Sequence, residues 1–470
     1  MIGVIVGLVL SAAQSQAEIT VYNQGFGLVK EVRQLKFKKG RQNIAIEDVA
    51  SMIEPTSVGF RSLTDKNSFT VLEQNYQYDL INAEAILNKS VGQPIRFVRS
   101  LGNQKEVLTG TLLSAPTAVI SNTDGSTQQT YTGMVIRTDD GRIVLDPTGE
   151  VEVRSIPTGL ISKPTLMWDV DSVKAGNDSV ELSYITQGIK WNADYVLTLD
   201  GAGKADLQGW VTIDNKSGAS WKDAKLKLLA GDVNRLRPLM QNFAVPDMNT
   251  GALNVMSAPA FQEESLFEYH LYTLGRPATV RNNETKQLSL LTGQGIPVHK
   301  KLIVDSIGGS YYPGEGEIGT GDIKPQVRLE FINDQKSGLG MALPKGNVKV
   351  YQRDQSGSVQ LLGEDQINHT PRNEKISLNV GKSFDVVSTR KRMSYHRISD
   401  RAFREVFEIE VRNRKEMPET VYVFERHYGD WRITEKNQAF TKIDSNTAQF
   451  VVDLKPNEAK KVVYTVETRW

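Results

Sequence analysis

The chain of 470 residues contains no cysteine. Disulfide bonds, thiolate metal sites and cysteine nucleophiles are therefore excluded. An excess of charge of one sign is also missing, because 56 Lys and Arg side chains are balanced by 55 Asp and Glu, a formal net charge of +1. Nucleic-acid-binding domains normally carry a clustered basic excess. The composition thus indicates that nucleic acid is not a partner.

Long hydrophobic runs are scarce. One lies in the N-terminal sequence MIGVIVGLVLSAAQSQA, from Ile2 to Leu10, and is shorter than the roughly 20 residues that a membrane-spanning helix needs. A small-x-small motif follows at 15–17, as in a secretory signal cleaved before Glu18. We expect residues 1–17 to be a signal peptide, so that the protein is exported to the periplasm or cell surface without a transmembrane helix in the mature chain. The alternative is that the apolar run is a buried first strand.

Helical periodicity is scarce as well, and only the stretch around Asp79–Leu87 looks helical. Elsewhere, alternation of apolar and polar residues dominates, as in SVELSYITQG and FEIEVRN, with Gly- and Asn-containing turns between such segments. We therefore expect an all-β protein built of tandem β-sandwich domains with few helices.

Changes in this pattern divide the chain into segments. Short strands and tight turns between residues 88 and 156 predict a small barrel of the SH3-like or Sm-like kind, inserted into the larger architecture. Two stretches have neither period and are expected to be flexible loops. The expected segments are an N-terminal β domain at 18–87, the β-barrel insertion at 88–156, a central β-sandwich at 157–322 with loops at 236–265 and 308–322, and a C-terminal β-sandwich at 323–470.

Four phrases, in order, resemble a known family: SYITQGIKWNADYVLTLD (183–200), GWVTIDNKSGASWKDAKLKLLAGDV (209–233), FEYHLYTLGRPATVRNNETKQLSLL (267–291) and LGEDQINHTPRNEKISLNVGKSFDVV (362–387). The bacterial family includes proteins labelled mucoidy inhibitor A, and its C-terminal region is catalogued only as a domain of unknown function. The resemblance implies a tandem β-sandwich, usually exported, with no established reaction and no catalytic residues to transfer. The chain lacks the coiled-coil segment of the longer members and has the insertion at about 88–156 instead.

The segment FEYHLYTL, which starts at Phe267, contains the best candidate for an acid–base pair. If it is one strand, Glu268 and His270 lie on the same face, where the carboxylate could orient the imidazole as a general base. Histidine also occurs on polar strand faces without a catalytic function, and we interpret the segment as such a strand. The five histidines are scattered without HxH or HExxH spacing, so we expect no metal site and no cofactor.

The Gly-rich stretch SYYPGEGEIGTGD is a candidate binding loop. Tyr311 and Tyr312 could present flat amphipathic surface to a partner. The alternatives are a solvated linker and a calcium loop, although the spacing of Glu315, Glu317 and Asp322 matches no known Ca loop. The loop at 236–265 carries Met, Leu and Phe and could also contact a partner.

These observations favour an exported, non-enzymatic protein that binds or assembles with another component of the cell envelope, either an envelope protein or a saccharide. A second hypothesis is a hydrolase or carbohydrate-active enzyme whose site is built from remote carboxylates. A third is an outer-membrane-associated β protein, because the last strand, YTVETRW, ends in an aromatic residue.

Overall fold

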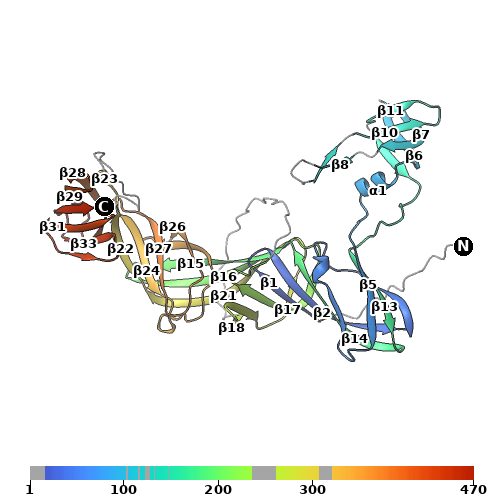
Figure 1. Ribbon diagram of the computed structural model, residues 1–470, viewed down its shortest axis with the longest axis horizontal. Helices are drawn as coiled ribbons and strands as arrows, with labels where there is room; N and C mark the ends of the chain where they lie inside the picture. The colour runs from blue at the N-terminus through green and yellow to red at the C-terminus, as the bar shows by residue number, and fades with distance from the viewer. Residues whose placement is uncertain are drawn as a thin grey trace.

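The computed structural model describes residues 16–101, 104–114, 117–121, 127–131, 133–147, 149–235, 261–305 and 320–470. Within these ranges the chain forms 34 strands and one α-helix, α1 (Ala83–Lys89), which overlaps the stretch expected to be helical. The strands build a series of sheets that follow one another along an elongated molecule (Figure 1). The expected all-β class is confirmed.

The first sheet joins strands that are far apart in the sequence. Strand β1 pairs in parallel with β17 and antiparallel with β2, and β2 pairs with β14 along its whole length. Strands from the expected segments 18–87 and 157–322 therefore lie in one sheet. Its order is β18 (Phe261–Leu266), β19 (Tyr269–Leu274), β17 (Trp221–Ala230), β1 (Gln16–Tyr22), β2 (Phe26–Phe37), β14 (Gly176–Gln187) and β4 (Gly59–Ser62), and β20 (Ala278–Val280) pairs with β17.

A three-stranded sheet covers one end of the first sheet. Its order is β3 (Gly40–Ile46), β13 (Thr165–Ser172) and β5 (Phe69–Gln77). The ring of Trp168 is buried between the two sheets, where it stacks on Phe60 at a centroid distance of 4.2 Å and donates its indole N–H to Gln74. The N-terminal strands β3 and β5 both need β13 as their partner.

The segment between β5 and β13 forms a projecting module (Figure 1). Helix α1 precedes a five-stranded sheet in the order β11 (Ile143–Leu145), β10 (Val135–Thr138), β7 (Gln104–Ser114), β6 (Pro94–Leu101) and β12 (Glu150–Val153), and a hairpin of β8 (Thr117–Ser121) and β9 (Thr127–Tyr131) follows β7. Strands β6, β7, β10 and β11 are successive antiparallel neighbours, and β12 pairs with β6. Among the described residues β11 and β12 are not paired with each other, so closure of the barrel stays a prediction.

The chain passes from the first sheet to a central sheet at Gly188, between β14 and β15. Gly188 has φ +78°, and a Cβ there would lie 2.8 Å from the Met52 sulfur, so both conformation and space favour glycine. The order of the central sheet is β21 (Glu284–Pro297), β16 (Lys204–Asn215), β15 (Ile189–Leu199), β25 (Gly346–Arg353) and β26 (Val359–Ile367). Strands β25 and β26 come from the expected C-terminal segment, so this sheet also joins distant parts of the chain.

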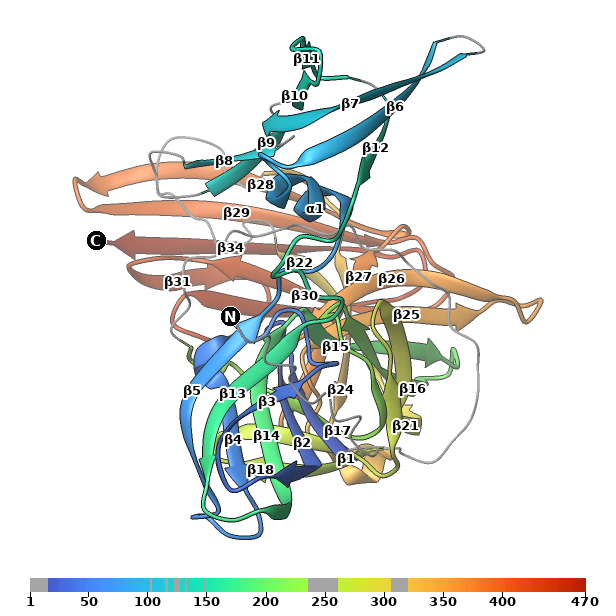
Figure 2. The same cartoon turned by 90° about the vertical axis from the view of Figure 1, so that its right-hand side faces the viewer.

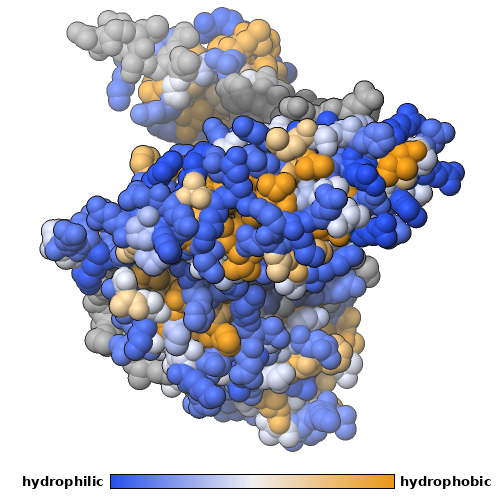
Figure 3. Space-filling model, turned by 90° about the vertical axis from the view of Figure 1, so that its left-hand side faces the viewer, coloured by the Kyte–Doolittle hydropathy of each residue, from blue (hydrophilic) through white to orange (hydrophobic). Residues whose placement is uncertain are grey.

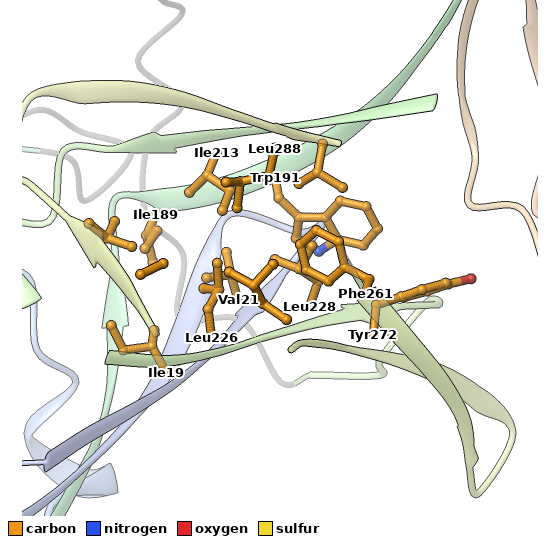
Figure 4. Packing of buried hydrophobic residues seen from close by; sticks show 14 of the residues in the cluster. Ile19, Val21, Ile189, Trp191, Ile213, Leu226, Leu228, Phe261, Tyr272 and Leu288 are labelled. Atoms are coloured by element: carbon orange, nitrogen blue, oxygen red, sulfur yellow. The ribbon is translucent and has the colours of Figure 1, made fainter. Parts of the chain in front are cut away.

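One hydrophobic cluster fills the space between the first and the central sheet (Figure 4). Ile19 and Val21 of β1, Leu228 of β17 and Trp191 of β15 are at most 1% exposed. Burying a side chain of this size contributes roughly 1.5–3 kcal/mol. The same cluster continues into the three-stranded sheet and, through Phe331 and other side chains, into the next sheet. The first, three-stranded and central sheets thus share one continuous core, which also includes Phe331 and its neighbours in the next sheet.

The C-terminal sandwich packs two further sheets against each other (Figure 2). The first has the order β27 (Lys375–Lys382), β24 (Gln326–Ile332), β22 (His299–Asp305), β30 (Glu419–Arg426), β33 (Thr447–Leu454) and β32 (Phe440–Lys442). The second has the order β23 (Gly321–Ile323), β28 (Val386–Ser399), β29 (Ala402–Asn413), β34 (Ala459–Arg469) and β31 (Asp430–Lys436).

The two expected loops are shorter than the sequence predicted. Residues 261–265 belong to β18 and residues 321–322 to β23, while 236–260 and 306–319 lie outside the described residues. Strand β18 lies at a sheet edge, where most of its side chains face solvent. Its sequence, FQEESL, therefore lacks the alternation of apolar and polar residues by which strands are recognised. Within the described ranges, no helix is long and apolar enough to cross a membrane.

The expected signal peptide lies mostly outside the described residues, but its last two residues begin β1. Gln16 and Ala17 pair with β2, and Ala17 is buried, but the parallel pairing of β1 with β17 runs only from Glu18 to Tyr22. We predict that a chain beginning at Glu18 loses only about 1 kcal/mol of the free energy of unfolding relative to the full chain, as measured by urea titration, because the pairing with β17 is kept. A chain beginning at Gln24, which lacks β1, should lose the sheet. Equal destabilisation of both chains would show that the strand needs its first two residues.

A buried ion pair joins the two sheets of the C-terminal sandwich. The guanidinium of Arg390 donates to both oxygens of Glu425, from 2.8 to 3.1 Å, and lies 3.9 Å from the ring centre of Phe407. The Tyr464 hydroxyl also donates to Glu425, and all these side chains are buried. Burial lowers the pKa of the neighbouring His427 to about 4, so its imidazole is neutral at pH 7.

Removal of one partner of this ion pair should strongly destabilise the folded protein. We predict that Glu425→Gln lowers the free energy of unfolding by about 3–5 kcal/mol, because the Arg390 charge stays buried without its carboxylate. The double substitution Arg390→Met with Glu425→Leu should be less destabilising than Glu425→Gln. The control Lys461→Ala, which breaks an exposed pair with Glu408, should cost under about 1 kcal/mol in the same urea titration. Equal losses for Glu425→Gln and the control would contradict this assignment.

Candidate functional site

The segment that suggested an acid–base pair is a hairpin, not a single strand. Strand β18 ends at Leu266, the chain reverses at Phe267 and Glu268, and β19 begins at Tyr269. Phe267 has φ +57°, in the left-handed region. Glu268 therefore lies in the turn and does not share a strand face with His270 as alternation predicted, because a reversal inside the segment is invisible to period-two counting.

The carboxylate that contacts His270 is Glu263, across the hairpin. Its Oε1 lies 2.8 Å from His270 Nδ1. Its Oε2 accepts a hydrogen bond from Arg372 Nη2 at 2.7 Å and one from the backbone N–H of Ala342 at 3.3 Å. The Glu263 side chain is 6% exposed, whereas those of His270 and Arg372 are 38% and 58% exposed. Glu263 is thus the buried centre of a cluster with a solvent-facing rim.

The far side of the cluster is built from two short segments near the central sheet. Leu343 and Thr370 exchange backbone hydrogen bonds of 2.8 and 2.9 Å, which holds the two segments together. The backbone N–H of Lys345 donates to Nδ1 of His369 at 3.2 Å. Tyr272 of the hairpin donates its hydroxyl to the carbonyl of Ala342 at 2.9 Å. The hairpin and these segments are therefore bound through both backbone and side chains.

Close packing fixes the position of the hairpin. Gly231, at the end of β17, has φ +142°, and a Cβ there would lie 2.3 Å from the ring of Tyr269. Any other residue would displace that ring. Tyr272 contacts Trp191 edge-on at a centroid distance of 6.3 Å (Figure 4), and Trp191 donates its indole N–H to the carbonyl of Leu229. The geometry of the cluster follows from these contacts with the core.

The environment of Glu263 favours its ionised form. Burial by itself would raise its pKa, but hydrogen bonds from Arg372, His270 and the Ala342 backbone outweigh burial, and the pKa is lowered. The same contact raises the pKa of Arg372. Burial, together with the nearby Glu263 charge, raises the pKa of Tyr272, which therefore keeps its proton. At neutral pH the centre of the cluster is a carboxylate–guanidinium pair.

A second histidine lies in the same electrostatic environment. Desolvation lowers the pKa of His369, the charges of Lys345 and His270 act in the same direction, and Asp232 opposes them. His369 is therefore mainly neutral at pH 7. The cluster combines two histidines, two carboxylates and two cationic side chains from four separate parts of the chain.

The contacts of this cluster favour a junction between sheets over a reaction centre. A carboxylate that orients an imidazole is the arrangement of a general base. Here, however, the carboxylate also binds Arg372 and the Ala342 backbone, and both contacts tie the hairpin to the central sheet. Within the described part of the chain, the only hydrogen bond of the His270 ring is with Glu263, and no group of three or more metal-ligating side chains is found.

Sequence reasoning identified one residue of this cluster and missed the others. His270 is present, Glu268 lies in the turn, and Tyr311 and Tyr312 lie outside the described residues. Glu263 and Arg372 are 109 residues apart in sequence. No local pattern connects them, because the contact exists only when the edge of one sheet meets the loops of another.

Comparison with known proteins adds no identification. No protein-family model matches the chain, and no curated protein is significantly similar to it. The resemblance to the mucoidy inhibitor A family therefore stays an expectation from the sequence.

We predict that Glu263→Gln destabilises the protein by about 1–3 kcal/mol at pH 7, because hydrogen bonds to a charged group are lost. The folded-state pKa of Glu263 is below its ordinary 4.5. The carboxylate therefore stabilises the fold fully above pH 4.5, and this contribution is lost as the pH falls through the lower folded-state value. Urea titrations should show that the difference between the two proteins narrows below pH 4.5. Glu268→Gln is the control and should have almost no effect, and a difference that is constant with pH would contradict this assignment.

Proposed function

We propose that the protein is an exported, non-enzymatic component of the cell envelope that binds or assembles with another envelope protein. The observation that carries the proposal is the projecting module between β5 and β13, which presents apolar side chains on the outside of a small independent core. The signal-like N-terminus supports export, as does the resemblance to a family that is usually exported.

The module has its own core. Phe97, Leu108, Leu112 and Ile136 form a hydrophobic cluster separate from those of the main body. Two chain segments connect it to the body. They are held together by two backbone hydrogen bonds, one from the Ile81 N–H to the Ile161 carbonyl and one from the Ile161 N–H to the Asp79 carbonyl. A module with its own core and two connecting segments keeps most of its surface available to a partner.

The outer side of the module exposes several apolar side chains. Leu145 is 72% exposed and Ile143 is 53% exposed, both on β11 at the edge of the sheet. Val107 and Leu113 of β7, which is separated from β11 by β10, are 45% and 40% exposed. Single exposed apolar residues are normal, but several of them on two strands of one small sheet favour contact with a protein partner.

The alternative of a hydrolase or carbohydrate-active enzyme stays a hypothesis. It requires two carboxylates a few ångströms apart around a substrate. In the cluster described above, Glu263 is bound by Arg372 and His270, so the nearest candidate acid is engaged in holding two sheets together.

Photo-cross-linking tests the proposal. A photo-reactive amino acid in place of Leu145 should give one discrete adduct with an envelope protein in intact cells. The matched control is Leu361, a 52% exposed leucine on β26 of the central sheet, where no such adduct is expected.

The substitution Ile143→Asp, added to the Leu145 probe, should reduce the adduct at least tenfold while the far-ultraviolet circular dichroism stays unchanged. The proposal fails if the Leu145 and Leu361 probes give the same adducts, or if Ile143→Asp leaves the Leu145 adduct intact.

A further inference from the structure

The hairpin of β28 and β29 combines exposed cations with exposed apolar side chains. Residues 390–404 contain six Lys and Arg side chains and one carboxylate, Asp400, in a chain whose net charge is +1. Figure 2 shows the hairpin reaching one side of the C-terminal sandwich, with the end of β34 beside it. We call the exposed residues at this place the cationic arm: Lys391, Met393, Arg397, Ile398, Arg401 and Trp470.

Three of the six cations are engaged inside the sandwich or on its outer face. Arg390 pairs with the buried Glu425, Arg392 with the buried Glu405, and Arg404 with Glu467. The other three belong to the arm. Lys391 and Arg401 are exposed and form no side-chain ion pair within the described part of the chain. Arg397 is 64% exposed and contacts Asp400, which is itself 96% exposed. The positive charges of these three side chains are thus only weakly neutralised by nearby carboxylates.

The apolar side chains of the arm lie between these cations. Met393 is 57% exposed, Ile398 is 49% exposed and Trp470 is 54% exposed. The backbone N–H of Trp470 donates to the carbonyl of Arg401 at 2.9 Å, so the backbone of Trp470 lies beside the tip of the hairpin. The space-filling view of this end of the molecule shows hydrophobic residues as separate patches within a mainly hydrophilic surface (Figure 3).

The edge of β28 is poorly suited to pairing with another strand. Strand β23 pairs only with residues 388–390, so the edge from Lys391 to Ser399 has no strand partner among the described residues. The register against β29 shifts twice along this edge, and each shift leaves one extra residue, Met393 and Ile398. Bulges of this kind bend a strand and interrupt its hydrogen-bonding row, which disfavours the addition of a strand from a partner protein.

We propose that the cationic arm docks on an anionic lipid surface. Cations near such a surface are attracted by the phosphate charge, with a gain of roughly five-fold in affinity for each Lys or Arg. Trp and large aliphatic side chains enter the boundary between headgroups and acyl chains. A soluble polyanion would use the same cations but would gain nothing from Met393 and Ile398. The coexistence of both kinds of side chain at one bulged edge therefore favours a membrane.

This inference does not rest on the projecting module. Figure 1 places the module and the C-terminal sandwich toward opposite ends of the long axis. One protein could then be held on a lipid surface at one end while it presents the module at the other. The two surfaces share no residue, so each can fail in experiment without the other.

Vesicle flotation tests the lipid proposal. The mature chain from Glu18 should float with vesicles of phosphatidylcholine mixed with phosphatidylglycerol and should stay in solution with phosphatidylcholine alone. Binding should weaken as salt is raised, because the attraction of exposed charges is screened. Equal binding to both vesicle types, or to neither, would overturn the proposal.

Two sets of variants separate a lipid surface from other polyanions. Lys391→Glu with Arg401→Glu should weaken vesicle binding more than 20-fold, whereas the matched control Lys190→Glu with Lys222→Glu, which changes the net charge equally at exposed sites elsewhere, should bind as before. Met393→Ser with Ile398→Ser should weaken vesicle binding several-fold at constant charge. Retention of a soluble polyanion such as heparin in place of vesicles, unaffected by the serine substitutions, would assign the arm to polyanion binding instead.

Discussion

The parallel pairing of β1 with β17 is the constraint on which the rest of the structure depends. It places Ile19 and Val21 of the first strand beside Leu226 and Leu228, which come more than 200 residues later in the sequence. All four side chains belong to the same hydrophobic core. A parallel pair cannot be joined by a tight turn, so the intervening chain must travel away and return. In doing so it forms β2, the three-stranded sheet, the projecting module and the central strands. The first strand therefore organises a large part of the molecule.

The first sheet, the three-stranded sheet and the central sheet each contain strands from distant segments, so these parts of the chain do not form independent domains. Strand β14 continues through Gly188 into β15, and β25 returns from the C-terminal half to pair with β15 in parallel. Ion pairs stabilise the contacts between sheets. Glu263 binds Arg372 between the hairpin and the central sheet, and Arg390 binds Glu425 across the C-terminal sandwich. A buried charge without its partner is costly, so these pairs fix the relative positions of the sheets they join. Such positional rigidity suits a protein that carries binding surfaces at its ends.

The two proposed binding surfaces rest on opposite physical features. The module presents side chains that water solvates poorly, such as Leu145, and gains by covering them with a protein partner. The cationic arm keeps well-solvated charges next to apolar side chains, which matches the layered chemistry of a lipid headgroup region. Neither feature is apparent from the composition of the whole chain, because the net charge averages the arm with acidic residues elsewhere.

The sequence by itself determined the all-β class, the approximate places of many strands and the helical stretch near residue 83, because alternation and turn residues act over a few neighbouring positions. It identified His270 but could not supply its partner. The tertiary structure alone decided that Glu263, and not Glu268, contacts this ring, that segments expected as separate domains share sheets, and that Arg390 and Arg392 pair with buried carboxylates while Lys391 and Arg401 face solvent. Each of these depends on contacts between residues far apart in the chain, which local periodicity does not encode.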